Sequence, residues 1–294
     1  MTILVTGATG TIGRQVVRHL IERGQQVRAL TRDPSRAVLP EGVEVAAGDL
    51  TDAASLEAAF DGVSAVHLIN FGGDYQPLTN GRHIVDLAEK AGIGKTTILA
   101  GWQEGMLEPA VKSSRLEWTF LQPVQFMANF LTDWGESLRT TGRVREPYGD
   151  RKSPPIDEYD IGAVAATVLT QDGHGGGSYH LTGPEVLSAR QMVAIIGEAT
   201  GRHLRFEELT PDQVRREWSV AGGRPHLYLF RAFSQAAGFG AADLVEILLQ
   251  MYGTPNEYGT TLTDQVEQVT GRPPRTFAQW AAEHARQFLP QPPA

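Results

Sequence analysis

The sequence predicts an α/β protein with a doubly wound parallel sheet and a smaller, mostly helical C-terminal lobe. A short apolar strand pattern at residues 3–6 leads directly into a glycine-rich turn and then into a helical pattern. Strand and helix patterns alternate through the first half of the chain, whereas the patterns after residue 188 are helical. Because right-handed crossovers between parallel strands place helices on both faces, this alternation indicates a doubly wound sheet.

The first turn has the glycine spacing of a turn that binds a diphosphate. Gly7 permits the tight turn, Gly10 lets backbone amides approach phosphates without a Cβ in the way, and Gly13 allows the helix to pack close to the strand. The new helix directs its unsatisfied N–H groups and its positive dipole end at an anion. An ordinary glycine-rich turn is the alternative. The residues expected to bind the diphosphate are Gly7, Thr9, Gly10, Thr11, Ile12 and Gly13.

The remaining elements follow from hydrophobic periodicity and from glycine or proline breaks. Strands are expected at 26–31, 43–46, 65–70, 96–101, 117–123 and 178–183, and a loop or short hairpin at 142–155. Helices are expected at 15–24, 78–91, 105–114, 157–171, 188–201, 211–218, 224–237, 241–252 and 276–288. We assign residues 1–155 to a dinucleotide-binding core and 156–294 to a substrate-binding lobe, with the strand near 178–182 returning to the core sheet.

Cofactor preference depends on the residues that follow the second strand. In dinucleotide folds an acid there binds the ribose 2′-hydroxyl, whereas an arginine accepts a 2′-phosphate. Here Arg32, with Arg36 four residues later, predicts the phosphorylated cofactor. Asp33 is a competing acid, but Asp followed by proline is also an ordinary turn opener, which we favour.

Other cofactor contacts are expected after the third to sixth strands. Asp49, followed by Leu50, either accepts from the adenine amino group or caps the helix that starts near residue 53, and both roles are compatible. The ends of the central strands are expected beside the ribose and nicotinamide. The residues expected there are Asn70, Phe71, Ala100, Gly101 and Pro123.

Composition excludes several classes of protein. The net charge of −8 argues against general nucleic-acid binding, and the absence of cysteine excludes disulfides, thiolate nucleophiles and Cys-ligated metals. The eight histidines show no metal-ligand spacing. No leader pattern precedes the first strand and no apolar run reaches membrane-spanning length, so we expect a cytoplasmic protein that binds no membrane.

Several segments together resemble the NmrA-like group of atypical short-chain dehydrogenases/reductases over nearly the whole chain. The matching segments are GATGTIG at 7–13, RDP at 32–34, GDL at 48–50, LEWTFLQP at 116–123 with FMAN at 126–129, DIGAVA at 160–165, HLTGPE at 180–185 and TGRPPRTF at 270–277. The resemblance implies a Rossmann domain, NADP(H) bound by the glycine turn and Arg32, a substrate cleft roofed by the C-terminal lobe, and a monomer or homodimer.

The sequence departs from this family's reductases at the catalytic positions. Those relatives place a Ser near the end of the fifth strand and a Tyr-x-x-x-Lys pair on the next helix, whose tyrosine donates a proton. Here the strand ends at Ala100-Gly101, residues 102–112 contain no tyrosine, and Glu104 stands where many members keep the lysine. Gln122-Pro123-Val124 likewise replaces the usual Arg-Pro-Gly. No catalytic residue is therefore assigned.

Two functional classes are compatible with these departures. The first is an NADPH-dependent ketoreductase acting on a bulky, aromatic, polyketide-like ketone or quinone, as in antibiotic biosynthesis, where a phenol beside the carbonyl supplies the proton. The second is a redox sensor or regulator that binds NADP(H) without turnover. We favour the first.

Aromatic residues near the expected cleft would suit a flat ligand, although core packing is the alternative for each of them. They are Phe71, Tyr75, Trp102, Phe126, Phe130 and Trp134. Other possible proton donors, none of them favoured, are His67, Tyr148, Asp157, Tyr159 and Tyr228. The segment Gly72–Tyr75 is interpreted as either a glycine-hinged lid or an ordinary loop.

Overall fold

The computed structural model describes residues 1–73, 75–101, 104–219, 240–254 and 258–290, so the helix expected at 224–237 lies outside the described residues. The chain forms two compact units. The first comprises Met1–Pro123, Glu158–Leu181 and Asp264–Pro273, and the second Val124–Asp157, Thr182–Thr263 and Pro274–Ala294. The expected return of the strand near 178–182 to the core sheet is present, but the division differs from the boundary expected at residue 155, because the return begins at Glu158 and Asp264–Pro273 also belong to the first unit. The chain returns to the first unit because a further parallel strand needs a crossover helix before it can join the sheet.

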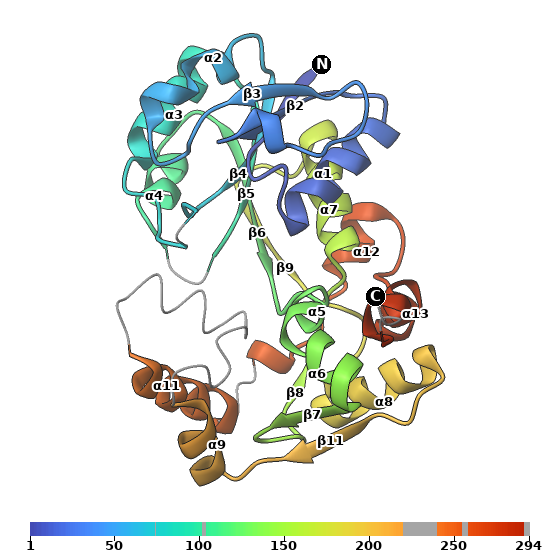
Figure 1. Cartoon of the computed structure of the whole chain (residues 1–294). Helices are drawn as coiled ribbons and strands as arrows, with labels where there is room; N and C mark the ends of the chain where they lie inside the picture. The colour runs from blue at the N-terminus through green and yellow to red at the C-terminus, as the bar shows by residue number, and fades with distance from the viewer. Residues whose placement is uncertain (74, 102–103, 220–239, 255–257, 291–294) are drawn as a thin grey trace. The chain divides into compact units, whose positions relative to one another are not determined.

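The first unit is built on a seven-stranded parallel sheet, which confirms the doubly wound fold (Figure 1). Its strands lie in the order β3-β2-β1-β4-β5-β6-β9, so the order reverses between β1 and β4. Ligands of such sheets bind outside the carboxyl ends of the strands at this reversal. The strands are β1 (Thr2–Val5), β2 (Gln26–Thr31), β3 (Glu44–Ala47), β4 (Ala65–Ile69), β5 (Lys95–Leu99), β6 (Glu117–Pro123) and β9 (Gly177–Leu181).

Helices cover both faces of this sheet (Figure 1). On one face α1 (Thr11–Glu22) packs against α7 (Glu158–Thr170), and α12 (Gln265–Thr270) packs on α7. The α1–α7 approach is close because Gly162 has no side chain: a β-carbon there would fall 2.7 Å from the carbonyl carbon of Gln15. The other face carries α2 (Glu57–Phe60), α3 (Gly81–Lys90) and α4 (Leu107–Lys112). Two short 3-10 helices, η1 (Pro34–Arg36) and η2 (Ala53–Leu56), lie in the connections.

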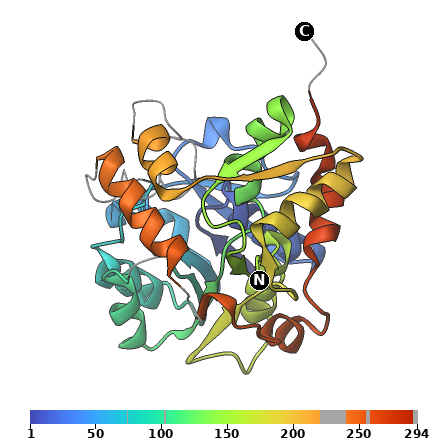
Figure 2. The same ribbon diagram turned by 90° about the horizontal axis from the view of Figure 1, so that it is seen from below.

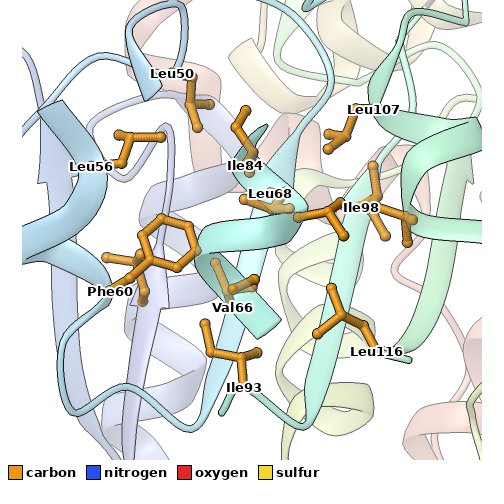
Figure 3. Close-up of a cluster of buried hydrophobic side chains, with 14 of the residues drawn as sticks. Leu50, Leu56, Phe60, Val66, Leu68, Ile84, Ile93, Ile98, Leu107 and Leu116 are labelled. Carbon is orange, nitrogen blue, oxygen red and sulfur yellow. The ribbon is translucent and has the colours of Figure 1, made fainter. Parts of the chain in front are cut away.

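The apolar core under α2, α3 and α4 follows the two-residue period of the strands (Figure 3). Val66 and Leu68 of β4 both point into this cluster, together with Ile98 of β5. Phe60 and Ile84 pack on them from α2 and α3. These side chains are buried, so the central strands form a rigid base beneath the loops at their carboxyl ends.

The second unit combines helices with two short two-stranded sheets. β7 (Arg143–Glu146) pairs in parallel with β11 (Arg205–Glu208), and β8 (Lys152–Ser153) pairs antiparallel with β10 (Leu187–Ser188). The sequence predicts a loop or a short hairpin at 142–155, but the two strands in this range pair with other strands and not with each other. One of these partners, β11, comes from the region expected to be helical. The helices described in this unit are α5 (Asn129–Asp133), α6 (Gly135–Thr141), α8 (Ala189–Thr200), α9 (Pro211–Trp218), α11 (Ala241–Gly253), η3 (Tyr258–Thr260), α13 (Phe277–His284) and η4 (Ala285–Phe288).

Among the described residues of the second unit, two apolar clusters hold the helices together. α8 and α13 pack against each other around one of them, which includes Met192 and Trp280. α9 and α11 lie side by side around the other, which includes Val214 and Leu248 (Figure 2). Among the described helices, none has both the length and the apolar character needed to cross a bilayer.

Candidate functional site

The glycine turn after β1 has the geometry that its sequence predicts. Gly7 adopts a left-handed backbone conformation with φ of +61°, and the amide of Gly10 donates to the Gly7 carbonyl at 2.8 Å. A β-carbon at Gly13 would fall 2.6 Å from the Gly7 carbonyl carbon and 2.8 Å from the Cα of Ala8. Only glycine therefore fits at position 13, where α1 begins close to β1.

The start of α1 can accept an anion. Gly10 precedes the helix in an extended conformation and provides no side-chain cap. The first N–H groups of a helix have no partner within the helix, and here no capping side chain competes for them. Gly10 and Thr11 are exposed, whereas Ile12 and Gly13 are buried. This uncapped, glycine-lined turn fits a diphosphate, which needs backbone donors and close approach.

Arg32 follows β2, and its guanidinium lies over Gly73 in the connection that follows β4. Among the described residues, none forms an ion pair or side-chain hydrogen bond with Arg32. Arg36 is also exposed, at the end of η1. The Asp33 carboxylate caps η1: its Oδ1 accepts from the amide of Ser35 at 3.1 Å and from the Ser35 hydroxyl. The favoured interpretation of Asp33 as a turn opener is confirmed.

Asp49 does not cap the next helix. The cap of η2 is Asp52, whose side chain accepts from the Ala54 amide at 3.2 Å. Asp49 Oδ1 instead accepts from the amide and hydroxyl of Thr51, at 2.9 and 2.8 Å. Leu50 packs its side chain into the core cluster of the first unit (Figure 3), so only its backbone is placed to meet a ligand.

A buried hydrogen-bond network joins the ends of β4 and β5. Asn70 follows β4, and its Oδ1 accepts from the amide of Gly101 at 2.8 Å. Its Nδ2 donates to Oε1 of Glu108, whose Oε2 accepts from the amide of Gly105 at 2.9 Å. Ala100 extends the β5 ladder by donating to the Leu121 carbonyl, and Pro123 ends β6 beside it.

Glu108 was not predicted as a site residue. Its only local signal is an acidic residue among Leu107, Ala110 and Val111, which form the buried side of α4. A charged side chain on the apolar side of a short helix indicates a buried polar partner, because a lone buried charge is costly.

The connection that follows β4 carries a stacked aromatic pair. The rings of Phe71 and Tyr75 lie 5.8 Å apart at 18°. Tyr75 has a φ of +61°, a left-handed backbone conformation that costs an L-residue free energy. Two backbone hydrogen bonds lie in this connection: the Gly72 amide donates to the Gln76 carbonyl at 2.8 Å, and the Tyr75 amide donates to the Gly72 carbonyl at 3.1 Å. Both interpretations of the segment, lid and ordinary loop, remain predictions.

Two of the expected substrate contacts belong to the core of the second unit. Phe130 and Trp134 are each 1% exposed and pack together with ring centroids 4.4 Å apart. Trp134 Nε1 donates to the buried Glu146 at 2.8 Å. Side chains with so little exposed surface offer nothing to a ligand, so the packing alternative holds for both. Phe126 is half-buried and stays a prediction, while Trp102 lies outside the described residues.

The possible proton donors that the sequence analysis did not favour contact other protein groups wherever the structure describes them. His67 is fully buried in β4, where its Nδ1 contacts the Thr97 hydroxyl at 2.8 Å. Tyr159 packs on His19, and Asp157 pairs with Arg275 at 3.1 Å. Tyr148 lies against the cluster of α9 and α11. Tyr228 is outside the described residues.

No group of three His, Cys, Asp or Glu able to hold a metal ion occurs among the residues that the structure describes.

Residues 1–100 match the NmrA-like family. The chain is 35% identical over 303 residues to the (4-alkanoyl-5-oxo-2,5-dihydrofuran-3-yl)methyl phosphate reductase of Streptomyces griseus subsp. griseus, covering 98% of this chain and 100% of that protein. It is 33% identical over 308 residues to the NAD(P)H azoreductase of Xenophilus azovorans, covering 97% and 99%. Among solved structures, the Citrobacter sp. triphenylmethane reductase complexed with NADP(H) superposes with a TM-score of 0.72 at 22% identity, covering 97% of this chain and 100% of that one.

Proposed function

The chain belongs to the NmrA-like family, and from that premise we propose that it is an NADPH-dependent oxidoreductase whose acceptor is a bulky aromatic ketone or quinone. The observation that carries the proposal is the uncapped glycine turn at the reversal of strand order, where sheets of this kind bind dinucleotides. Two relatives that are at least 33% identical over nearly the whole chain are named as reductases, one of them with NAD(P)H in its name.

The residues of the first unit are suited to hold each part of the cofactor. The amides of residues 9–12 would bind the diphosphate, and Arg32, assisted by Arg36, would bind the 2′-phosphate. Asp49 would accept from the adenine amino group. The nicotinamide end would lie near Asn70, Phe71, Ala100, Gly101 and Pro123. When bound, the reduced nicotinamide supplies a hydride to the acceptor.

The chain's own part in the reduction is to position the acceptor and exclude water. The stacked Phe71 and Tyr75 provide a flat apolar surface suited to an aromatic ring. Residues 102–112 contain no tyrosine to protonate the product oxygen. A phenol next to the acceptor carbonyl forms an internal hydrogen bond that polarises the carbonyl and then delivers the proton. We therefore infer substrate-assisted protonation.

The missing tyrosine also supports a second candidate, a sensor that binds NADP(H) without turnover. The two candidates share the cofactor site and differ only in whether an acceptor is reduced.

A panel assay separates them. Binding of NADPH is followed by its fluorescence, and turnover by the loss of its absorbance with three acceptors: naphthoquinone, an anthraquinone with a hydroxyl beside the carbonyl, and the methyl ether of that anthraquinone. We expect NADPH to bind and the hydroxyanthraquinone to be reduced at least about tenfold faster than its methyl ether. This ratio means that the activation barrier of the hydroxyanthraquinone is lower by about 1.4 kcal/mol. Binding without consumption of NADPH by any acceptor supports the sensor, and no binding rejects both candidates.

A further inference from the structure

Glu108 is a buried carboxylate whose described partners are amides. It lies in the first turn of α4 and is 2% exposed. Its Oε1 accepts from Asn70 Nδ2 and its Oε2 accepts from the Gly105 amide. Among the described residues no cation pairs with it. A carboxylate buried in this way is costly unless its hydrogen bonds are all made, so its position is tightly constrained.

The network fixes the orientation of the Asn70 side chain. The amide of Gly101 is a donor only, so the atom of Asn70 that faces it at 2.8 Å must be the oxygen. The Asn70 nitrogen then faces Glu108, which accepts. A rotated Asn70 amide would place two donors together at Gly101 and leave Glu108 facing an oxygen. Glu108 thus favours one of the two orientations.

The same carboxylate connects two strand ends. Asn70 immediately follows β4, Gly101 lies two residues after β5, and the last residues of these neighbouring strands, Ile69 and Leu99, are paired. Through Asn70 the network holds Gly101, and directly it holds Gly105. Glu108 therefore links Asn70, directly after β4, to the amides of Gly101 and Gly105.

We propose that Glu108 is a positioning residue for the nicotinamide end of the dinucleotide site, acting through Asn70 and the amides of Gly101 and Gly105. The proposal rests on the proposed function, which places the nicotinamide at Asn70 and Gly101. Glu108 contacts these protein groups and not the reacting atoms.

Glu108→Gln is the direct test, with Glu104→Gln as its matched control. Glutamine keeps the shape but turns one acceptor into a donor that must face either Asn70 or the Gly105 amide. We expect the Kd of NADPH to rise about tenfold. Glu104 undergoes the same chemical change four residues away, but its side chain is 76% exposed and 3.6 Å from Lys112, so its Kd should stay within about twofold.

A double-mutant cycle distinguishes positioning from a general loss of packing. Because Glu108 acts in part through Asn70, Glu108→Gln should weaken NADPH binding less in the Asn70→Ala background than in the wild-type protein. Independent, additive losses would overturn the proposal. Glu108→Asp, which keeps the charge but shortens the side chain, is the second variant should Glu108→Gln not fold. A Kd for NADPH equal to that of the wild-type protein, in whichever of these two variants folds, would also overturn the proposal.

Hydrogen exchange of the Gly101 and Gly105 amides provides a readout without cofactor. Both should exchange at least about tenfold faster in Glu108→Gln than in Glu104→Gln, because their acceptors are removed or misplaced. If the wild-type protein fails to bind NADPH, the proposed function fails. If the wild-type protein binds NADPH but the Gly101 and Gly105 amides exchange equally fast in Glu108→Gln and Glu104→Gln, only the proposed role of Glu108 is rejected.

Discussion

The guanidinium of Arg32 lies so close to the backbone of Gly73 that a β-carbon at residue 73 would fall 2.7 Å from Arg32 Cζ. Arg32 follows β2 and Gly73 follows β4, on either side of β1 in the sheet. The missing side chain at Gly73 thus leaves room for the arginine at the edge where β1, β2 and β4 end. A cation held at this edge is suited to bind a 2′-phosphate.

Replacing Arg32 should therefore affect one cofactor and not the other. In Arg32→Ala we expect the Kd of NADPH to rise at least about tenfold, because a charge-assisted hydrogen bond contributes about 1.5–3 kcal/mol. NADH lacks the phosphate, so its Kd should change less than about twofold. Fluorescence titration with both cofactors checks this. An equal loss of affinity for NADPH and NADH would reject the binding of the 2′-phosphate by Arg32.

Gly73→Ala tests the same contact from the other side. The added methyl displaces the guanidinium, which can move because it ends a flexible exposed side chain. The fold should persist while the preference for NADPH over NADH falls several-fold. Gly94→Ala is the control, since a β-carbon there meets its nearest atom, the Ser64 carbonyl oxygen, at 3.9 Å. An unchanged preference in Gly73→Ala would show that the position of Arg32 does not matter.

The glycines of the first turn should separate stability from binding. A methyl at Gly13 meets backbone at 2.6 Å, so Gly13→Ala should lower the free energy of unfolding by about 1–3 kcal/mol and weaken both cofactors. A methyl at Gly10 meets the Gly7 carbonyl oxygen at 3.1 Å, a tight contact but a less severe one. Gly10→Ala should lose less stability and still weaken cofactor binding. Urea unfolding and NADPH titration measure the two effects, and a greater stability loss in Gly10→Ala would contradict the packing geometry.

Trp134→Phe distinguishes a core residue from a substrate contact. The change removes the indole N–H that donates to the buried Glu146, so we expect the free energy of unfolding to fall by about 2 kcal/mol. The KM for a reducible acceptor should remain within about twofold. Unchanged stability with a several-fold higher KM would restore Trp134 to the substrate site.

The parts of the fold that could be predicted are those encoded locally. The glycine spacing of residues 7–13 specified a turn, and alternating strand and helix patterns specified a parallel sheet with helices on both faces. The role of Asp33 was also local, since its partner Ser35 is two residues away.

Features that depend on distant partners were missed or left open. β7 pairs with β11, which begins some sixty residues later, so no local pattern reveals it. Asn70 and Glu108 meet across 38 residues, and the burial of Glu108 follows from the packing of α4. Phe130 and Trp134 have a helical spacing that is typical both of side chains packed in a core and of side chains that contact a ligand. Only the position of α13, whose Phe277 packs edge-on to Phe130, settles the difference.

Buried histidine should make stability depend on pH. Burial in β4 lowers the pKa of His67 from 6.5 to about 4, so the unfolded chain binds a proton in this interval and the folded protein does not. Stability from this group is fully present above pH 6.5 and is lost as the pH falls to about 4, by at most about 3 kcal/mol. Burial also lowers the pKa of His19 to about 4, against the opposing charge of Glu22, so the wild-type slope includes both residues.

His67→Asn isolates the contribution of His67, because asparagine can retain the contact with Thr97 but does not titrate. Urea unfolding between pH 4 and 6.5 should give a smaller loss of stability in His67→Asn than in the wild-type protein, with the difference between the two curves growing as the pH falls. The same substitution at the exposed His83 is the control for the change from histidine to asparagine itself. Parallel curves for His67→Asn and the wild-type protein would mean that His67 accepts its proton in the folded state as readily as in the unfolded chain, and that the sheet around it admits water.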